Sequence, residues 1–149
     1  MTEIVIPSKI KRIECCTFFN CKSLMNITLP DGLTYIGVEA FRGCGALTDI
    51  EIPDSVTRID SGAFISCDSF ESFYLPDGIT KLYPRTFDNC ARLQKIIIPE
   101  GVTFISERVF SNCKSLDYIV IPNSVEGIDD AAFINCPNLK RVLILNRRT

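Results

Sequence analysis

The sequence contains no histidine and no tryptophan. Histidine is the commonest general base in enzymes and accompanies cysteine in many zinc sites, so its absence argues against both kinds of site. The chain also lacks a G-x-S-x-G nucleophile motif and a glycine-rich phosphate-binding loop. We therefore expect no catalytic residue, no metal ligand and no cofactor, and we predict that the protein is not an enzyme.

Long hydrophobic runs are missing too. No apolar stretch approaches the roughly 20 residues of a membrane-spanning helix, so we expect no membrane insertion. The opening residues, MTEIVIP, show no basic segment followed by an apolar one, and we expect no signal peptide there. The net charge is −2, whereas a nucleic-acid binder needs a clustered basic surface, so we expect no nucleic-acid partner.

What the sequence does contain is a repeat of 23 residues. Three residue types recur in one unbroken register: Pro7, Pro30, Pro53, Pro76, Pro99 and Pro122; Phe18, Phe41, Phe64, Phe87, Phe110 and Phe133; Cys21, Cys44, Cys67, Cys90, Cys113 and Cys136. A fixed period of this length indicates a solenoid of stacked units, none of which can bury its apolar side alone. We predict one domain over residues 1–149, with six full repeats over 1–138, a terminal strand at 139–145 and a short tail.

Each unit has the same internal plan. Ile27 and Leu29 alternate with the variable Thr28, which is typical of a strand with one buried face. Pro30 then ends the strand because it has no N–H for the next ladder bond. A turn, a second short apolar pair and a compact segment follow, in which Phe and Cys lie three residues apart and face inward.

The unit, written L-x-x-I-x-I-P-x-x-V-x-x-I-x-x-x-A-F-x-x-C-x-x, resembles the BspA-like class of leucine-rich repeats over residues 1–145. The resemblance implies a right-handed, β-rich solenoid with a parallel concave sheet of about seven short strands. Loops and short helical or 3₁₀ turns would form the convex side. Many members of the family are surface or secreted proteins implicated in adhesion or protein binding, but a fold does not by itself fix a function.

The cysteines invite the idea of a disulfide or metal site, and the repeat argues against it. Six of the eight occupy the repeated inward position, where cysteine acts as a small buried hydrophobic residue. Cys15 and Cys16 lie outside that position, and we expect their equivalents in other units (Val38/Glu39, Ser61/Gly62 and Glu107/Arg108) to be exposed. They are either reactive thiols or an incidental pair. Free thiols suit a reducing compartment, whereas the family resemblance favours the cell surface, so localisation stays open.

The strand residues that point away from the core give the candidate binding surface. They form two columns along the array: Val5, Thr28, Glu51, Tyr74, Ile97, Val120 and Leu143; and Glu3, Asn26, Asp49, Ser72, Lys95, Tyr118 and Arg141. The columns are polar and acidic around Asp49 and Glu51, and become apolar and basic from Tyr74 onward. Exposed apolar patches rimmed by charge commonly mark contact sites. We predict a protein-contact surface at Asp49, Glu51, Tyr74, Lys95, Ile97, Tyr118, Val120, Arg141 and Leu143.

The two ends of the array suggest a competing role. Terminal repeats normally need a polar cap, and neither the strand at Met1 nor the strand ending at Leu145 shows one. Unpaired strand edges favour pairing with another chain. The alternative prediction is therefore a structural fragment of a longer surface array, or a unit that self-associates through its terminal strands.

Overall fold

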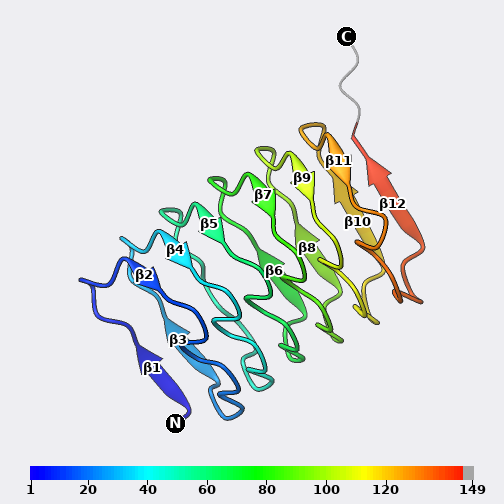
Figure 1. Ribbon diagram of the computed structural model, residues 1–149. Helices are drawn as coiled ribbons and strands as arrows, with labels where there is room; N and C mark the ends of the chain where they lie inside the picture. The colour runs from blue at the N-terminus through cyan, green and yellow to red at the C-terminus, as the bar shows by residue number, and fades with distance from the viewer. Residues whose placement is uncertain (146–149) are drawn as a thin grey trace.

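A computed structural model describes residues 1–145 and forms a parallel β-solenoid in which each coil contributes short strands to two separate sides (Figure 1). The first-strand series consists of β1 (Glu3–Val5), β3 (Asn26–Thr28), β6 (Ser72–Tyr74), β8 (Lys95–Ile97), β10 (Tyr118–Ile121) and β12 (Arg141–Ile144). The second-strand series consists of β2 (Arg12–Ile13), β4 (Tyr35–Ile36), β5 (Arg58–Ile59), β7 (Lys81–Leu82), β9 (Phe104–Ile105) and β11 (Gly127–Ile128).

Neighbouring strands pair in parallel, with partners 23 residues apart, as the repeat predicts. Ile4 lies opposite Ile27, Phe73 opposite Ile96 and Ile119 opposite Val142. Equivalent positions of successive repeats therefore stack directly on one another. A column read from the sequence is a physical row of side chains along the solenoid.

The first-strand series is less continuous than predicted. It pairs two by two, as β1–β3, β6–β8 and β10–β12, and the expected strand at residues 49–51 does not form. The two outward residues there are Asp49 and Glu51, and acidic side chains are disfavoured in strands. Six first strands are present instead of about seven.

The third side of each coil consists of turns, and the prediction of short helical or 3₁₀ segments is wrong for the residues that the structure describes. The turns do contain bonds between residues three apart, such as the Cys44 N–H to the Phe41 carbonyl (3.1 Å). Left-handed residues on either side, Glu39 (φ 52°) and Gly43 (φ 79°), stop each turn from continuing into a helix. Bonds between coils replace helical ones, as from the Phe41 N–H to the Ala63 carbonyl (2.8 Å).

Between the three sides runs one hydrophobic core, which contains the Phe and Cys columns. The repeated phenylalanines stack along the axis: Phe41 and Phe64 have ring centroids 5.4 Å apart and planes 5° apart, and Phe64 and Phe87 lie 5.8 Å apart. Two further rings, Phe70 and Phe73, meet Phe64 edge-on. Within residues 1–145 there is no helix with the length and apolar character to cross a membrane.

Candidate functional site

The predicted contact surface lies on the first-strand series, and the structure exposes its apolar part to solvent. Tyr74, Ile97 and Leu143 are 61%, 47% and 44% exposed, although large apolar side chains usually face the core. Lys95 and Arg141 are exposed beside them, and Tyr118 and Val120 are half-buried. The alternation of these residues with buried ones, such as Ile96 and Ile119, turns them outward.

Four of these residues line one apolar hollow of about 400 Å³: Lys95, Ile97, Tyr118 and Val120. Pro99 and Pro122, the strand-ending prolines of two neighbouring repeats, close one side of the hollow. Tyr74 and Leu143 do not line it; they belong to the neighbouring strands β6 and β12. β8 and β10 thus supply an apolar recess with a lysine and a tyrosine at its border.

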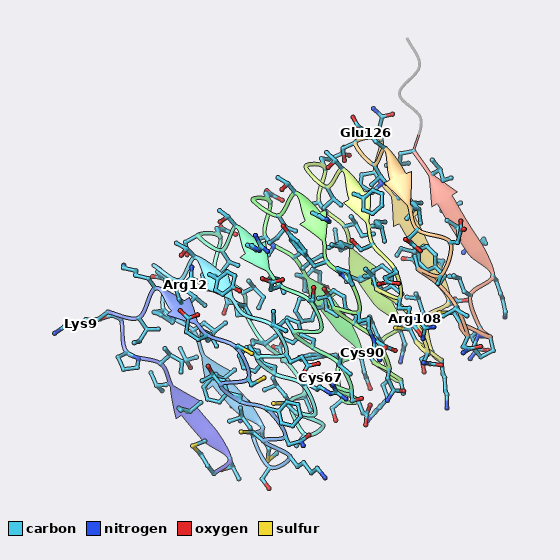
Figure 2. The ribbon with its side chains drawn as sticks, viewed as in Figure 1. Lys9, Arg12, Cys67, Cys90, Arg108 and Glu126 are labelled. Atoms are coloured by element: carbon cyan, nitrogen blue, oxygen red, sulfur yellow. The ribbon has the colours of Figure 1, made fainter. Side chains whose placement is uncertain are left out.

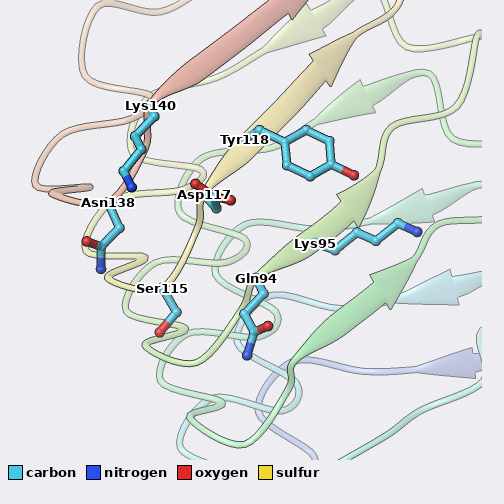
Figure 3. A pocket seen from close by; sticks show the side chains of 7 residues that line it. All are labelled: Gln94, Lys95, Ser115, Asp117, Tyr118, Asn138 and Lys140. Carbon is cyan, nitrogen blue, oxygen red and sulfur yellow. The ribbon is translucent and has the colours of Figure 1, made fainter.

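A second, polar hollow of about 540 Å³ lies on the other side of Lys95 and Tyr118. Figure 3 shows these two side chains projecting in the same direction from neighbouring strands. The remaining side chains of the polar hollow are Gln94, Ser115, Asp117, Asn138 and Lys140. Lys95 and Tyr118 therefore separate an apolar recess from a polar one. Such an arrangement suits a partner that presents an apolar group next to hydrogen-bonding groups.

The acidic residues of the prediction lie elsewhere. Asp49 and Glu51 are exposed, but the apolar hollow does not include them. Glu51 instead lines a smaller hollow of about 230 Å³ together with Thr28, Asp31 and Pro53. The predicted surface therefore consists of an acidic part and an apolar, basic part that line separate hollows.

The second-strand series carries a row of cations and aromatic rings that sequence reasoning missed. The Arg12 guanidinium lies 4.0 Å from the Tyr35 ring centroid, and the Arg58 guanidinium lies 4.5 Å from that of Tyr83. Lys81 Nζ reaches Tyr83 at 4.8 Å. The signal was available in the sequence: the column Arg12, Tyr35, Arg58, Lys81, Phe104 mixes basic and aromatic residues at the 23-residue period. The Tyr35 and Tyr83 rings thus already form cation–π contacts within the chain, and such contacts stabilise the protein.

Asp60 lies beside this row, and its carboxylate interacts with three neighbouring groups. Its carboxylate accepts hydrogen bonds from the Tyr35 hydroxyl (2.9 Å) and the Ser61 N–H (2.8 Å), and Arg58 lies 3.2 Å away. Burial by itself would raise the pKa of Asp60, but the Ser61 N–H, the Tyr35 hydroxyl and Arg58 outweigh it and leave the pKa lowered. Burial and the Asp60 carboxylate raise the pKa of the Tyr35 hydroxyl. The ionised carboxylate is therefore a stabilising group.

Replacing Asp60 should change how stability depends on pH. A carboxyl whose folded pKa is lowered stabilises the protein above its unfolded pKa, about 4, and loses that contribution as pH falls through the folded value. We expect Asp60→Asn to lower the free energy of unfolding by about 1–3 kcal/mol at neutral pH, because the network loses the negative charge and one of its two acceptor oxygens. The difference from wild type should shrink below pH 4, as urea unfolding at a series of pH values would show.

Asp68 provides the matched control, because burial raises the pKa of its carboxyl. Asp68→Asn should not produce a loss of stability that grows with pH. Parallel pH profiles for wild type and Asp60→Asn would contradict the role given to Asp60.

The repeated cysteines are free, as predicted, and Cys44, Cys67, Cys90 and Cys113 are fully buried. Figure 2 places Cys67 and Cys90 inside the solenoid. Each buried thiol donates to the phenylalanine carbonyl 26 residues earlier, for example Cys90 Sγ to the Phe64 oxygen at 3.2 Å. Burial raises the pKa of Cys44 to about 11 and raises those of the other three as well. These thiols are packing groups that are protonated at neutral pH.

Metal binding finds no support in the described part of the chain, where no three His, Cys, Asp or Glu side chains come together in a way that could hold an ion. Three charged side chains line the apolar recess, namely Lys95, Asp77 and Glu100, and Lys95 also lines the polar hollow. The residues of the recess could therefore contact a partner through apolar surface and charged groups.

Comparison with known families decides what kind of protein presents this surface. The model of the BspA type leucine-rich repeat region matches residues 1–117 and 36–149, in six copies. The chain belongs to the BspA-type leucine-rich-repeat family. No curated protein matches this BspA-type chain.

Solved structures of bacterial proteins share the solenoid. A leucine-rich cell surface protein of Faecalibacterium prausnitzii is 36% identical over 97% of this chain, with a TM-score of 0.90. A leucine-rich repeat protein of Bacteroides ovatus is 33% identical over 95% (TM-score 0.91), and one of T. pallidum is 29% identical over 95% (TM-score 0.90). This BspA-type chain spans 39%, 37% and 68% of those three chains, respectively. It shares the scaffold of bacterial surface repeat proteins.

Proposed function

We propose that this chain is a non-enzymatic scaffold that binds a protein partner through the apolar, basic part of its first-strand face. The observation that carries the proposal is the 400 Å³ apolar recess of β8 and β10, lined by Lys95, Ile97, Tyr118 and Val120. Exposed Tyr74 and Leu143 extend apolar character to β6 and β12. Tyrosine and arginine are enriched at the residues that dominate binding energy, and Arg141 lies 5.8 Å from the Tyr118 ring.

The second-strand face is a weaker candidate. The Tyr35 and Tyr83 rings have guanidinium or ammonium groups over them, and Arg12 and Arg58 are paired with Glu14 and Asp60. A partner would have to break these contacts before it could form its own. The apolar side chains of the first-strand face are more exposed, and a partner that binds there would have fewer existing contacts to break.

An adhesive role at a cell surface follows from the same proposal. The similar protein of Faecalibacterium prausnitzii is described as a cell surface protein. A surface location would give the apolar recess access to proteins of other cells.

The test is site-specific photocrosslinking. A photoreactive amino acid at Tyr74 should form an adduct with a partner from a surface-protein extract. The same group at Thr28, an exposed position in the same column, should not. Equal labelling from both positions would contradict the proposed location.

A second role, as a segment of a longer array or as a self-associating unit, is favoured by the exposed apolar residues of β12. Val142 and Ile144 are 43% and 67% exposed although they continue the inward columns of the earlier strands. Crosslinking distinguishes this role: an adduct from a photoreactive amino acid at Ile144 to a second copy of the chain would favour self-association over a foreign partner.

A further inference from the structure

Cys15 and Cys16 are the two cysteines that the packing of the repeat does not explain. Both are exposed, and their sulfurs lie 3.2 Å apart, in contact but not bonded. The buried thiols of the repeat each donate to a phenylalanine carbonyl; the described contact of this pair is between its own two sulfurs. Two adjacent thiols that touch each other and face solvent form a vicinal dithiol.

The backbone holds the two side chains in this arrangement. Cys16 has a left-handed conformation (φ 59°), and its N–H donates to the Val38 carbonyl of the next coil at 3.0 Å. Gly37 lies against the preceding peptide, between Glu14 and Cys15: a Cβ at residue 37 would come within 2.8 Å of the Cys15 nitrogen. Close approach of the next coil therefore supports the peptide that carries both thiols.

The place of the pair in the repeat is one at which side chains can face solvent. The equivalent residues of a coil with neighbours on both sides are Glu107 and Arg108, and both are exposed. The same left-handed conformation recurs at Arg108 (φ 54°). Exposure at this place varies between coils, since Ser61 is half-buried and Gly62 is buried, so the exposure of Cys15 and Cys16 belongs to their own coil.

We propose that Cys15 and Cys16 are a redox-active vicinal dithiol, which an oxidant of the disulfide class converts into a disulfide between the two neighbouring residues. Glutathione disulfide is a representative oxidant. The site is a modification site distinct from the first-strand face, and the proposal does not depend on a binding partner.

The reaction proceeds in two exchanges. One thiolate of the pair attacks a sulfur of glutathione disulfide; a protein–glutathione bond forms, the glutathione S–S bond breaks, and the released thiolate takes up a proton. The second protein thiol then loses its proton to solvent and attacks the first protein sulfur, which expels the second glutathione. In sum, the two cysteines lose two protons and two electrons, and one glutathione disulfide takes them up to become two glutathione molecules.

Proximity favours the second exchange. The attacking sulfur starts 3.2 Å from its target side chain, and positioned groups react as though present at very high concentration. The hydrogen bond between the two sulfurs raises the pKa of Cys16, so the Cys16 thiol is protonated at neutral pH and loses its proton in the second exchange. The buried thiols cannot compete, because reactivity requires both a thiolate and access to the oxidant.

The experiment is intact-mass measurement of the folded chain after incubation with excess glutathione disulfide. Wild type should lose two hydrogen atoms and retain no glutathione. Cys16→Ser should instead carry one glutathione on Cys15, because the second exchange has no attacking thiol. Ser66 already adopts a left-handed conformation at another turn, so the replacement suits the backbone at residue 16.

Cys21 supplies the control, since it is half-buried and lies in the same tryptic peptide, residues 13–22. Cys21→Ser should still lose two hydrogen atoms. The proposal is overturned if this variant no longer loses them, if Cys15 and Cys16 each retain a glutathione, or if the wild type does not react. Far-UV circular dichroism of each variant confirms that the reaction is that of the folded chain.

Discussion

Phe64→Ala should lower the free energy of unfolding by about 3–5 kcal/mol, the range typical of a fully buried phenylalanine reduced to alanine. Phe64 is completely buried and stacks between Phe41 and Phe87, with centroid distances of 5.4 and 5.8 Å. Phe70 and Phe73 contact the same ring edge-on. The substitution opens a cavity at the centre of the stack and weakens two interfaces between coils at once. Urea unfolding followed by circular dichroism would measure the loss.

Phe133 is the matched control for this prediction. It occupies the same position of the repeat, but it is half-buried and stacks on one described ring, Phe110, at 5.4 Å. Phe133→Ala should therefore destabilise the chain clearly less than Phe64→Ala. Equal losses at the two positions would show that the ring stack is not what couples the coils.

The simultaneous replacement of Tyr74, Ile97 and Val120 with serine should weaken partner binding by at least about a hundredfold, because truncating a residue that dominates an interface commonly costs 2 kcal/mol or more. Tyr74 and Ile97 are exposed and Val120 is half-buried, so the loss of core contacts is small. The free energy of unfolding should change by no more than about 1 kcal/mol for each of the three substitutions, the span of strand propensities. Titration calorimetry with the crosslinked partner, once purified, gives the affinity, and urea unfolding gives the stability.

The repeat made the arrangement of the chain predictable, because one period assigns every residue to a column. Ile96 is buried and Ile97 is 47% exposed, as their alternation required. The same reasoning placed the repeated cysteines inside and Cys15 and Cys16 outside. Periodicity therefore predicted burial well at positions where every repeat has the same type of residue.

The exceptions arise where the outcome depends on contacts between particular side chains or on local backbone geometry. The strand at residues 49–51 was expected because Ile50 has the buried phase, but Asp49 and Glu51 flank it and no strand forms. Helical turns were expected from the spacing of Phe41 and Cys44, whereas the left-handed residues between coils end each turn. Positive φ recurs at fixed places of the repeat, but one of them holds residues as different as Cys16, Glu39 and Arg85, so residue type does not reveal it.

The candidate site shows the same division. That Lys95 and Tyr118 share a face followed from the columns, but the recess beside them depends on how Pro99 and Pro122 close it. The network of Tyr35, Arg58 and Asp60 joins two columns across a coil boundary, and a column read alone does not reveal it. Columns give the direction in which a side chain points, whereas hollows and networks require the packed neighbours.

The most direct test of the account compares two triple variants in one binding assay. The first carries Tyr74→Ser, Ile97→Ser and Val120→Ser on the first-strand face; the second carries Arg12→Ser, Lys81→Ser and Phe104→Ser on the second-strand face. If the first-strand face is the contact surface, only the first variant should lose affinity for the partner, and both should remain folded. Unchanged affinity in the first variant, or loss of affinity confined to the second, would contradict the proposed role of the first-strand face.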